Sequence, residues 1–578
     1  MSKNGLPRKP LTKRRLKNLI LNVLKNPFNM VVLVSLIILF CLIIIPLLTM
    51  ISSTFTLAQG ELRRVQGHVG DFTLYYWKYI LTGKLASAVL WGPLKNSFIC
   101  GFFTVLVSVP LGSVLAWLMI RTDLPGKKIL GLLVTVPYMI PSWTKALAWL
   151  AMFRNSTSGA NGFLAGLGIP VPDWLAYGPI AIVLCMSMHY YAFSYIMVSG
   201  ALRSINSELE EMGEIQGASK AQILRHITLP LILPSVLSAT VMTISKSIGT
   251  YGVPANLGNR IGYYTLATKM RTFIDQGPQA VGYSMSIVLV LLAALIIFSN
   301  QRIVGVRKSY ATVSGKGGRA TLMQLGKAKK PLMLFLMVFL FLAMVVPFFV
   351  LIMETFQITT GAGYGLDNLT LYNWIGKAGE IDKYTNYVGI FRNPNFFSAF
   401  WNTIRLTLIA SILTAICGQF LGYISSRGRG KWYGDLTEQM VFVPYLMSGI
   451  AFSTMYFSMF SRPHLGGLMP SLYGTFTLIV LTSVVKHFPF ASKSGTANML
   501  SISVELEEGC GYRRRQLLEA DVLHHRSSGE KRLHFRLHAD LHFHRQGAGP
   551  HYHHDDSHHP DHVLPGLYLL PGRLQPDV

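Results

Sequence analysis

The chain has 578 residues, of which 51% are hydrophobic and 13% are charged, and its formal net charge is +26 at pH 7. So much apolar surface excludes an ordinary soluble domain. The Lys and Arg residues stand in short segments between long apolar runs, as in the cytoplasmic loops of membrane proteins, so the charge does not predict a nucleic-acid partner. The composition predicts an all-α protein that crosses a lipid bilayer several times.

Uncharged apolar runs recur along the chain, and the first extends from Met30 to Met50. About 20 apolar residues span a bilayer core of roughly 30 Å, and only helices satisfy their own backbone there. We predict ten spans, near 30–50, 97–120, 129–152, 179–199, 231–250, 281–299, 332–352, 400–424, 439–460 and 471–490. With a cytoplasmic N-terminus, the basic loops all fall inside, and the segments 52–96, 154–178, 251–280 and 353–397, which contain Trp and Tyr, fall outside.

Three motifs occur twice in the same order. They are Thr73–Trp77 and Thr370–Trp374, 208–211 and 505–508, and a span bracketed by Asn96 and Arg121 or by Asn402 and Arg427. The separation between the copies is nearly constant, which indicates a tandem duplication with a small insertion. We therefore divide the chain into a basic N-terminus (1–29), a first unit (30–300), a basic connector (301–330), a truncated second unit (331–508) and a tail (509–578).

A charged loop, residues 208–230, follows the fourth predicted span. Its sequence predicts a short helix, a break at Gly217, and a second short helix that ends at Pro230. Pro230 opens the fifth span, where its missing N–H costs little. On composition alone, the loop is as well explained by an ordinary amphipathic surface segment as by a functional element.

The spacing of this loop resembles the EAA loop of ABC-importer permeases, in which Glu-Ala-Ala is followed by three residues, Gly, nine residues and Ile-x-Leu-Pro. The matching residues are Glu211, Gly217, Ile227, Leu229 and Pro230. Met212 and Gly213 stand where the family has alanines. The stretches Arg121–Lys128 and Gly252–Gly258 also resemble the family, most closely its fused ferric-iron permeases, with thiamine and polyamine permeases as near relatives. The resemblance covers roughly residues 10–508.

The resemblance implies a role for the loop and a set of partners. Glu211 and Gly217 would couple the chain to a cytoplasmic ATPase, Ala218 to Pro230 would complete the docking element, and Glu508 would be the surviving start of a second coupling site. The implied protein is a tandem pair of six-helix units in the bacterial inner membrane, with its N-terminus in the cytoplasm. It would take substrate from a periplasmic binding protein and work with two ATPase copies, which use ATP and Mg.

The sequence contains no Gly-x4-Gly-Lys-Ser/Thr phosphate loop, so we expect a transport subunit without a cofactor of its own rather than an enzyme. Ferric iron is the substrate that the resemblance favours, and thiamine, a polyamine or another small solute remains an alternative. An ion-coupled secondary transporter is the rival class. Proton-coupled carriers usually place carboxylates inside their spans, and the ten predicted spans contain none, although sodium coupling through backbone carbonyls stays open.

Some polar residues within or near the spans are candidates for a translocation path. They are Lys145, His189, Lys246, Lys486 and His487. Snorkelling, or a hydrogen bond between helices, explains each of them equally simply and is more common. A ferric ion prefers oxygen ligands, so the phenols of Tyr190, Tyr191 and Tyr251 are further candidates. The five cysteines show no spacing that predicts a metal site or a disulfide framework.

The character of the chain changes at Gly509, because 12 of the 17 histidines lie in 509–578 and no apolar run there is long enough to span a membrane. A His-rich metal-binding tail is one interpretation. We favour a reading-frame shift after Glu508. If the first base of the Gly509 codon is dropped, the following triplets can encode Ala-Ala-Gly-Ile-Asp-Gly-Ala, which restores the EAA spacing. We therefore predict that 509–578 has no stable fold, that two of twelve ancestral spans are missing, and that the chain transports poorly.

Overall fold

The structure is a computed structural model that describes residues 27–62, 65–158, 160–205, 208–306, 322–363, 365–377, 388–461, 463 and 470–500. Within these ranges the chain is helical, with three isolated β-bridges and no β-strand. This confirms the predicted all-α class. Most of the N-terminal segment 1–29, much of the connector and the tail lie outside the described residues.

The helices of the first half begin with α2 and end with α16. They are α2 (Pro27–Leu39), α3 (Ile45–Ser53), α4 (Tyr75–Leu81), α5 (Gly92–Arg121), α6 (Lys127–Met139), α7 (Ser142–Phe153), α8 (Phe163–Gly166), α9 (Asp173–Ala176), α10 (Gly178–Ser204), α11 (Glu208–Ile215), α12 (Lys220–Ile223), α13 (Leu229–Ile248), α14 (Gly252–Leu257), α15 (Leu266–Gln276) and α16 (Gln279–Val306). Those of the second half are α17 (Lys329–Leu340), α18 (Val346–Glu354), α19 (Tyr372–Ile375), α20 (Pro394–Arg427), α21 (Trp432–Leu446), α22 (Gly449–Phe460) and α23 (Phe476–Leu500).

Seven helical segments of the described chain are long and apolar enough to cross a membrane, and the pair α21–α22, bent by 107°, is an eighth candidate. They coincide with eight of the ten predicted spans. The tenth prediction, 471–490, falls on α23, which begins later and runs to Leu500. The third and ninth predictions, 129–152 and 439–460, were wrong in their continuity, and the ninth is interrupted at Met447 and Ser448. Ile140 and Pro141 are extended and separate α6 from α7, because a residue before proline is pushed out of the helical region and Pro141 has no N–H to continue the ladder.

The two copies of the motif, Thr73–Trp77 and Thr370–Trp374, make the same side-chain contacts. The Trp77 indole N–H donates to Thr54 Oγ1 at 3.1 Å, and the Trp374 indole N–H donates to Thr355 Oγ1 at 3.0 Å. A phenylalanine stacks on each indole, with ring centroids 6.0 and 5.9 Å apart. The partners follow one another in the same order in both halves, so the two copies fold alike at these positions.

The first span of each half has the same irregularity. Single π-helical turns at Phe40–Ile44 and Phe341–Val345 are each followed by a proline, Pro46 or Pro347, at the second residue of the next helix. A proline removes one donor from the helical ladder, and a local π turn is a common way to accommodate the loss. The first spans of the two halves therefore share the same π-helical turn as well as a similar hydropathy.

Helices α5 and α10 pack closely in the first half, and α20 and α23 do the same in the second. Glycines make these crossings tight. A Cβ added at Gly112 would lie 2.4 Å from the Tyr191 carbonyl oxygen, and one added at Gly418 would lie 2.2 Å from Ala491 Cβ. Small residues at crossings let helices approach each other where lipid provides no hydrophobic driving force. Contacts between α5 and α10 run from Thr104 with Ser187 to Arg121 with Ile205, so this pair is parallel, as is the pair α20–α23, and the two pairs form the centre of each half.

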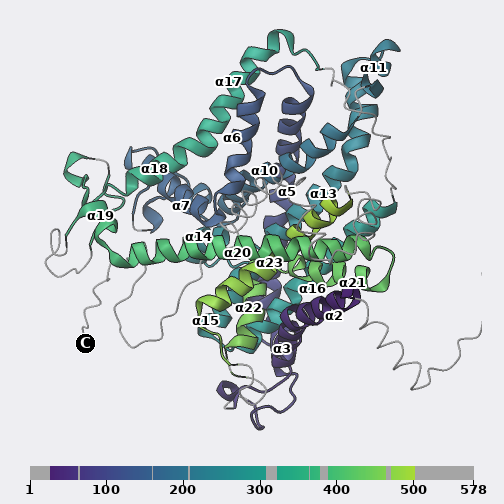
Figure 1. The fold of residues 1–578 in the computed structure, drawn as a ribbon. Coiled ribbons are helices and arrows are strands. Elements are labelled where there is room, and N and C mark those ends of the chain that lie inside the picture. The colour runs from purple at the N-terminus through teal and green to yellow at the C-terminus, as the bar shows by residue number, and fades with distance from the viewer. Residues whose placement is uncertain are drawn as a thin grey trace, which may run out of the picture.

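The two halves exchange their first spans. Helices α2 and α3 pack on α21 and α22, and the Tyr456 hydroxyl donates to the Leu42 carbonyl at 2.6 Å. In the same way, α17 and α18 of the second half pack on α6 and α7 of the first (Figure 1). Each half is therefore completed by a helix from the other, so the described helices form one body rather than two separable domains.

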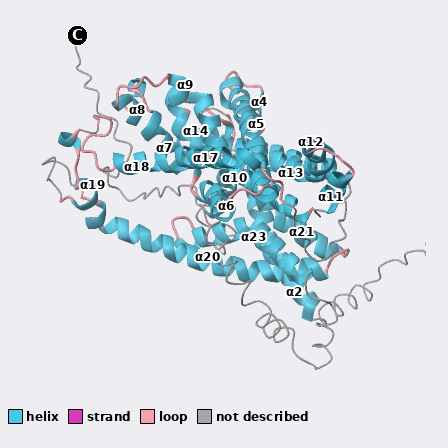
Figure 2. Cartoon of the chain, turned by 90° about the horizontal axis from the view of Figure 1, so that it is seen from above, coloured by secondary structure: helices cyan, strands magenta, loops and turns pink. Residues whose placement is uncertain are grey.

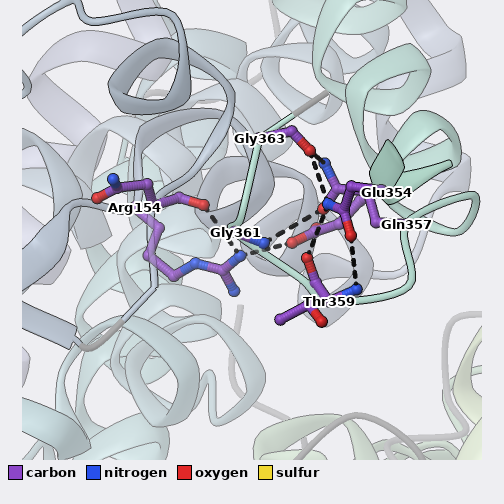
Figure 3. Close-up of polar contacts among 8 residues, drawn as sticks. Arg154, Glu354, Gln357, Thr359, Gly361 and Gly363 are labelled. Atoms are coloured by element: carbon purple, nitrogen blue, oxygen red, sulfur yellow. Dashed lines mark hydrogen bonds and ion pairs between the residues drawn. The ribbon is translucent and has the colours of Figure 1, made fainter. Parts of the chain in front are cut away.

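An ion pair fastens one of these exchanged contacts. Arg154, just after α7, bonds Glu354 at the end of α18 with an N–O distance of 2.6 Å, and both side chains are largely buried. Figure 3 shows this contact beside a tight loop in which the Gln357 side chain bonds the backbone of Gly361 and Gly363. A Cβ on Gly361 would lie 2.8 Å from Ala160 Cβ, so this loop sits directly on the first half.

A second link between the halves involves the start of α17. The backbone N–H of Leu325 and the ammonium of Lys329 bond the two carboxylate oxygens of Asp123 at 3.0 and 3.1 Å. These bonds hold the pKa of Asp123 below its usual value. The 208–230 loop lies at one end of the molecule and α19 at the other, in both views (Figures 1 and 2), as expected if a membrane separates them.

Candidate functional site

The 208–230 loop folds as two helical segments joined by a tight turn. Gly217 ends α11 with φ of +82°, a left-handed conformation that favours glycine. The Ala218 N–H donates to the Gly213 carbonyl at 3.0 Å and closes the end of α11. Ser219 then starts α12 through a capping box with Gln222. The first helix and the break at Gly217 are present as predicted. The second helix was predicted to end at Pro230, but it continues through the π-helical turn Leu224–Thr228 into α13, because Pro230 stands at the start of α13, where no N–H is needed.

Glu210 connects this loop to two long helices. One carboxylate oxygen accepts from the Thr228 hydroxyl at 2.7 Å, just before α13, and the other lies 3.4 Å from the guanidinium of Arg121 at the end of α5. Arg121 also donates to the Ile205 carbonyl at 3.3 Å, and its side chain is only 4% exposed. Because Glu210 bonds residues at the ends of both helices, a displacement of α11 would also move α5 and α13.

The predicted coupling residues surround this contact. Glu211 is half-buried on α11, and Ile227 packs against Gly213, where an added Cβ would lie 3.1 Å from Ile227 Cδ1. Leu229 and Pro230 begin α13 and are exposed, and Glu508 lies outside the described residues. The packing shows why Gly213 occupies a family alanine position, because a larger residue would push α11 away from the π-helical turn Leu224–Thr228.

The outer side of α11 is apolar. Met212 is 57% exposed and Ile215, one helical turn further on, is 85% exposed. Two large apolar side chains one turn apart on a short charged helix have no stabilising role in an isolated chain, and exposed apolar patches commonly mark interaction sites. Together they form what we call the α11 face.

A cavity of about 970 Å³ lies between the two halves. Its walls come from α6, α7, α10, α13, α15 and α16 of the first half and from α21, α22 and α23 of the second. The breaks between α6 and α7 and between α21 and α22 both open onto it. Cavities at the interface of two repeats, lined by interrupted helices, are where membrane transporters hold their substrates.

Lysines satisfy the free carbonyls at the two helix breaks. Lys145 donates to the Pro137 carbonyl and lies 2.6 Å from His189 Nδ1. Lys486 donates to the Pro444 carbonyl at 2.9 Å and also to the Met447 carbonyl. A broken helix at membrane depth leaves carbonyls without intrahelical partners, and these must be paired inside the protein. The ammonium groups also lie at the negative ends of α6 and α21, which favours a cation there.

Replacing Lys486 by methionine is expected to lower the stability of the chain by about 2–3 kcal/mol, because two buried carbonyls lose their charged donor. Thermal unfolding of the purified chain in detergent measures the effect. Lys246→Met is the matched control, since it removes a similar ammonium that donates no hydrogen bond to a described residue. Equal melting temperatures for the two variants would contradict the carbonyl-capping role.

The structure places most of the predicted path residues at the cavity. His189, Lys246, Tyr251, Lys486 and His487 line it, as does Tyr190, whose hydroxyl lies 2.7 Å from Thr250 Oγ1. Lys145 stands one layer behind, against His189. Tyr191 does not line the cavity, because its ring packs against Phe339 of α17 and is fully buried in the core. Residues two positions apart on a helix point about 200° apart, so His189 and Tyr191 face opposite sides of α10.

Several cavity residues were missed by the sequence reasoning. Trp143 lines the cavity from inside the predicted span 129–152, and Arg271 and Asp275 line it although they lie between predicted spans. Tyr138 and Tyr445 also line it, and both follow a Val-Pro pair. This Val-Pro-Tyr sequence, which occurs once in each half, is the signal that could have located both helix breaks. No cluster of three or more His, Cys, Asp or Glu residues that could hold a metal ion occurs in the described parts of the chain.

Comparisons with known proteins agree with this architecture. Residues 108–309 match the family model of the binding-protein-dependent transport system inner membrane component. A putative ferric transport system permease protein of Haemophilus influenzae, FbpB 1, is 23% identical over 420 residues, 72% of this chain and 62% of that relative. The sulfate permease protein CysT of Salmonella typhimurium is 25% identical over 227 residues, 39% of this chain and 78% of CysT. The putative 2-aminoethylphosphonate permease protein PhnV of the same species is 28% identical over 232 residues, 40% of this chain and 80% of PhnV.

The fold and the matched domain define a multi-pass membrane transport protein rather than an enzyme. More specifically, residues 108–309 are similar to the permease domain of binding-protein-dependent transport systems, and this matched stretch includes the 208–230 loop and much of the cavity wall. The sequence resemblance to these permeases is thereby confirmed.

Proposed function

We propose that the chain is the translocating subunit of an ATP-driven importer in the bacterial inner membrane, with its N-terminus in the cytoplasm. The α11 face docks on a cytoplasmic ATPase, and a periplasmic binding protein delivers the substrate on the side of α19. The observation that carries the proposal is Glu210, which ties the loop to both α5 and α13 while Met212 and Ile215 point outward.

The same contacts suggest how ATP binding would reach the substrate. Helix α13 begins at the loop and rises about 26 Å from Leu229 to Lys246 at the cavity. A rigid helix of this length converts movement of α11 into movement of one cavity wall. Closure of the ATPase would in this way alternate the access of the cavity between the two membrane faces.

Ferric iron is the cargo that we propose for the importer. Its support is that the ferric permease of Haemophilus influenzae aligns with 72% of this chain and thus with both halves, whereas the sulfate and phosphonate relatives align with 39% and 40% of it. The tyrosine hydroxyls at the cavity supply oxygen donors suited to such a cargo.

Replacing Ile215 by aspartate is expected to reduce retention of the ATPase subunit at least about tenfold, because an apolar anchor at a protein interface would become a buried charge. The full-length tagged chain is co-expressed with an ATPase subunit that contains a phosphate-binding loop, and the ratio of the two proteins is measured after purification. Ile169→Asp, at an exposed position on the α9 side, serves as control. Equal retention by both variants would refute docking through α11.

A further inference from the structure

The charges that face the cavity between the halves are unbalanced. Its lining includes Lys246, Lys486 and Arg271, and Asp275 is the one carboxylate among the described lining residues. Arg271 and Asp275 bond each other at 2.6 Å and largely cancel. Two lysines, one from each half of the chain, therefore remain without a carboxylate partner.

These two lysines converge on one part of the wall. The Lys246 ammonium lies 5.2 Å from the ring centre of Tyr445 and 6.0 Å from that of Phe490, and the Lys486 ammonium lies 5.0 Å from that of Phe452. Lys246 is close enough to interact electrostatically with both Lys486 and His189. Aromatic rings and carbonyls offset part of the cost of placing charge here, but the two ammonium groups still repel each other.

Lys246 differs from Lys486 because its ammonium caps no carbonyl among the described residues. Lys486 donates to two carbonyls at a helix break, so the fold itself explains that lysine. Lys246 donates no hydrogen bond to any described residue, stands partly exposed at the cavity, and lies at the end of the helix that begins at the coupling loop. An ammonium retained in a membrane-embedded wall without a structural partner marks a place where a ligand supplies the partner.

We propose that the cavity binds an anion between Lys246 and Lys486, so that the transported species is a negatively charged, oxygen-rich solute. This inference rests on the proposed transport function and narrows its substrate. Iron would cross as an anionic complex with oxyanion ligands rather than as a bare cation. Thiamine and polyamines, which are cations, would be repelled by the same lysines.

The test is thermal unfolding of the purified full-length chain at constant ionic strength, with sulfate, citrate, ferric citrate or spermidine added to a chloride buffer. Oxyanions are expected to raise the melting temperature by several degrees, because they relieve the repulsion between the lysines, and spermidine is expected to have no effect. A shift with ferric citrate alone would identify the iron complex as the ligand, whereas equal shifts with sulfate and citrate would identify free oxyanions. Both results support the anion site.

Three variants locate the effect. Lys246→Met is expected to weaken oxyanion binding at least tenfold and to melt no lower than the unmodified chain, because it also removes the repulsion. Lys246→Glu is expected to lose the response to anions and gain one to spermidine. Lys269→Met is the matched control, since Lys269 is a half-buried lysine over the Tyr264 ring, 4.5 Å from its centre, outside the cavity lining.

Stabilisation of the unmodified chain by spermidine, or an oxyanion response that survives in Lys246→Met, would overturn the anion site. So would the absence of any oxyanion response. Retention of the ATPase subunit, measured on the same preparations, separates this failure from a failure of the transport proposal. A chain that retains the ATPase but ignores anions contradicts only the anion site, and a chain that binds anions without retaining the ATPase contradicts only the coupling assignment.

Discussion

Deleting the first base of the Gly509 codon is expected to raise the number of ATPase subunits retained per chain from one to two, and to give ATP-dependent uptake of ferric iron where the present chain gives little or none. The restored frame would continue Glu508 with Ala-Ala and place a glycine where the EAA spacing requires it. The first half shows why those residues matter, because its loop depends on the glycine turn and on the helix that follows it.

The duplication makes this expectation specific. Arg427 is the counterpart of Arg121 in the second half, and Glu507 is the counterpart of Glu210, so the duplication predicts a second ion pair that ties the restored loop to α20. Glu507 lies outside the described residues. Light scattering of the purified complexes gives the ratio of subunits, and removal of the whole Gly509 codon, which keeps the present frame, is the control. Full uptake by the present chain, or an unchanged ratio after the frame is restored, would contradict the frameshift explanation.

Gly217→Pro is expected to abolish retention of the ATPase at the first loop while leaving the chain in the membrane. The proline ring restricts φ to negative values, whereas Gly217 has φ of +82°. Proline would also remove the N–H that Gly217 donates to the Glu214 carbonyl at 2.9 Å. The turn would open, and α11 would no longer present Met212 and Ile215 in their present direction.

Gly262→Pro is a closely matched control for this variant. Gly262 also has a left-handed conformation, with φ of +72°, and donates its N–H to the Asn259 carbonyl at 3.1 Å, but it lies on the far side of α13 from the loop. In neither position would an added Cβ meet another atom within 4 Å. Retention of the ATPase is measured for both variants, together with their amounts in the membrane fraction. Equal retention would mean that the turn at Gly217 has no part in docking.

The fold of the 208–230 loop was predictable because its signals are local. A glycine turn, a serine cap and a proline at a helix start each act within a few residues, and their spacing fixes where α11 ends and α13 begins. The role of Glu210 was not predictable in the same way. Its partner Arg121 lies at the end of α5, far earlier in the chain, and the sequence reasoning selected the neighbouring Glu211 from the family spacing instead.

For the cavity, the sequence located the polar residues but not their roles. Hydropathy located the polar residues Lys145, His189 and Lys246 inside or near spans, but it could not tell which of them faces a common space and which caps a broken helix. That distinction depends on the bend at Ile140 and Pro141, which an average over an apolar window hides. The Pro137 and Pro141 pair was visible in the sequence, and taken with Pro444 it would have predicted the interruption.

A photo-reactive amino acid placed at position 215 tests the central claim most directly, because it asks what the α11 face touches in the membrane. The variant chain is co-expressed with the ATPase subunit, irradiated in membranes, and analysed for a covalent product of the two proteins. The same substitution at Leu366, an exposed position in the loop before α19, is the control. The model of coupling predicts a product with the ATPase from position 215 and none from position 366. A membrane in which position 215 gives no such product, although both proteins are present, would contradict the assignment of the 208–230 loop as the coupling element.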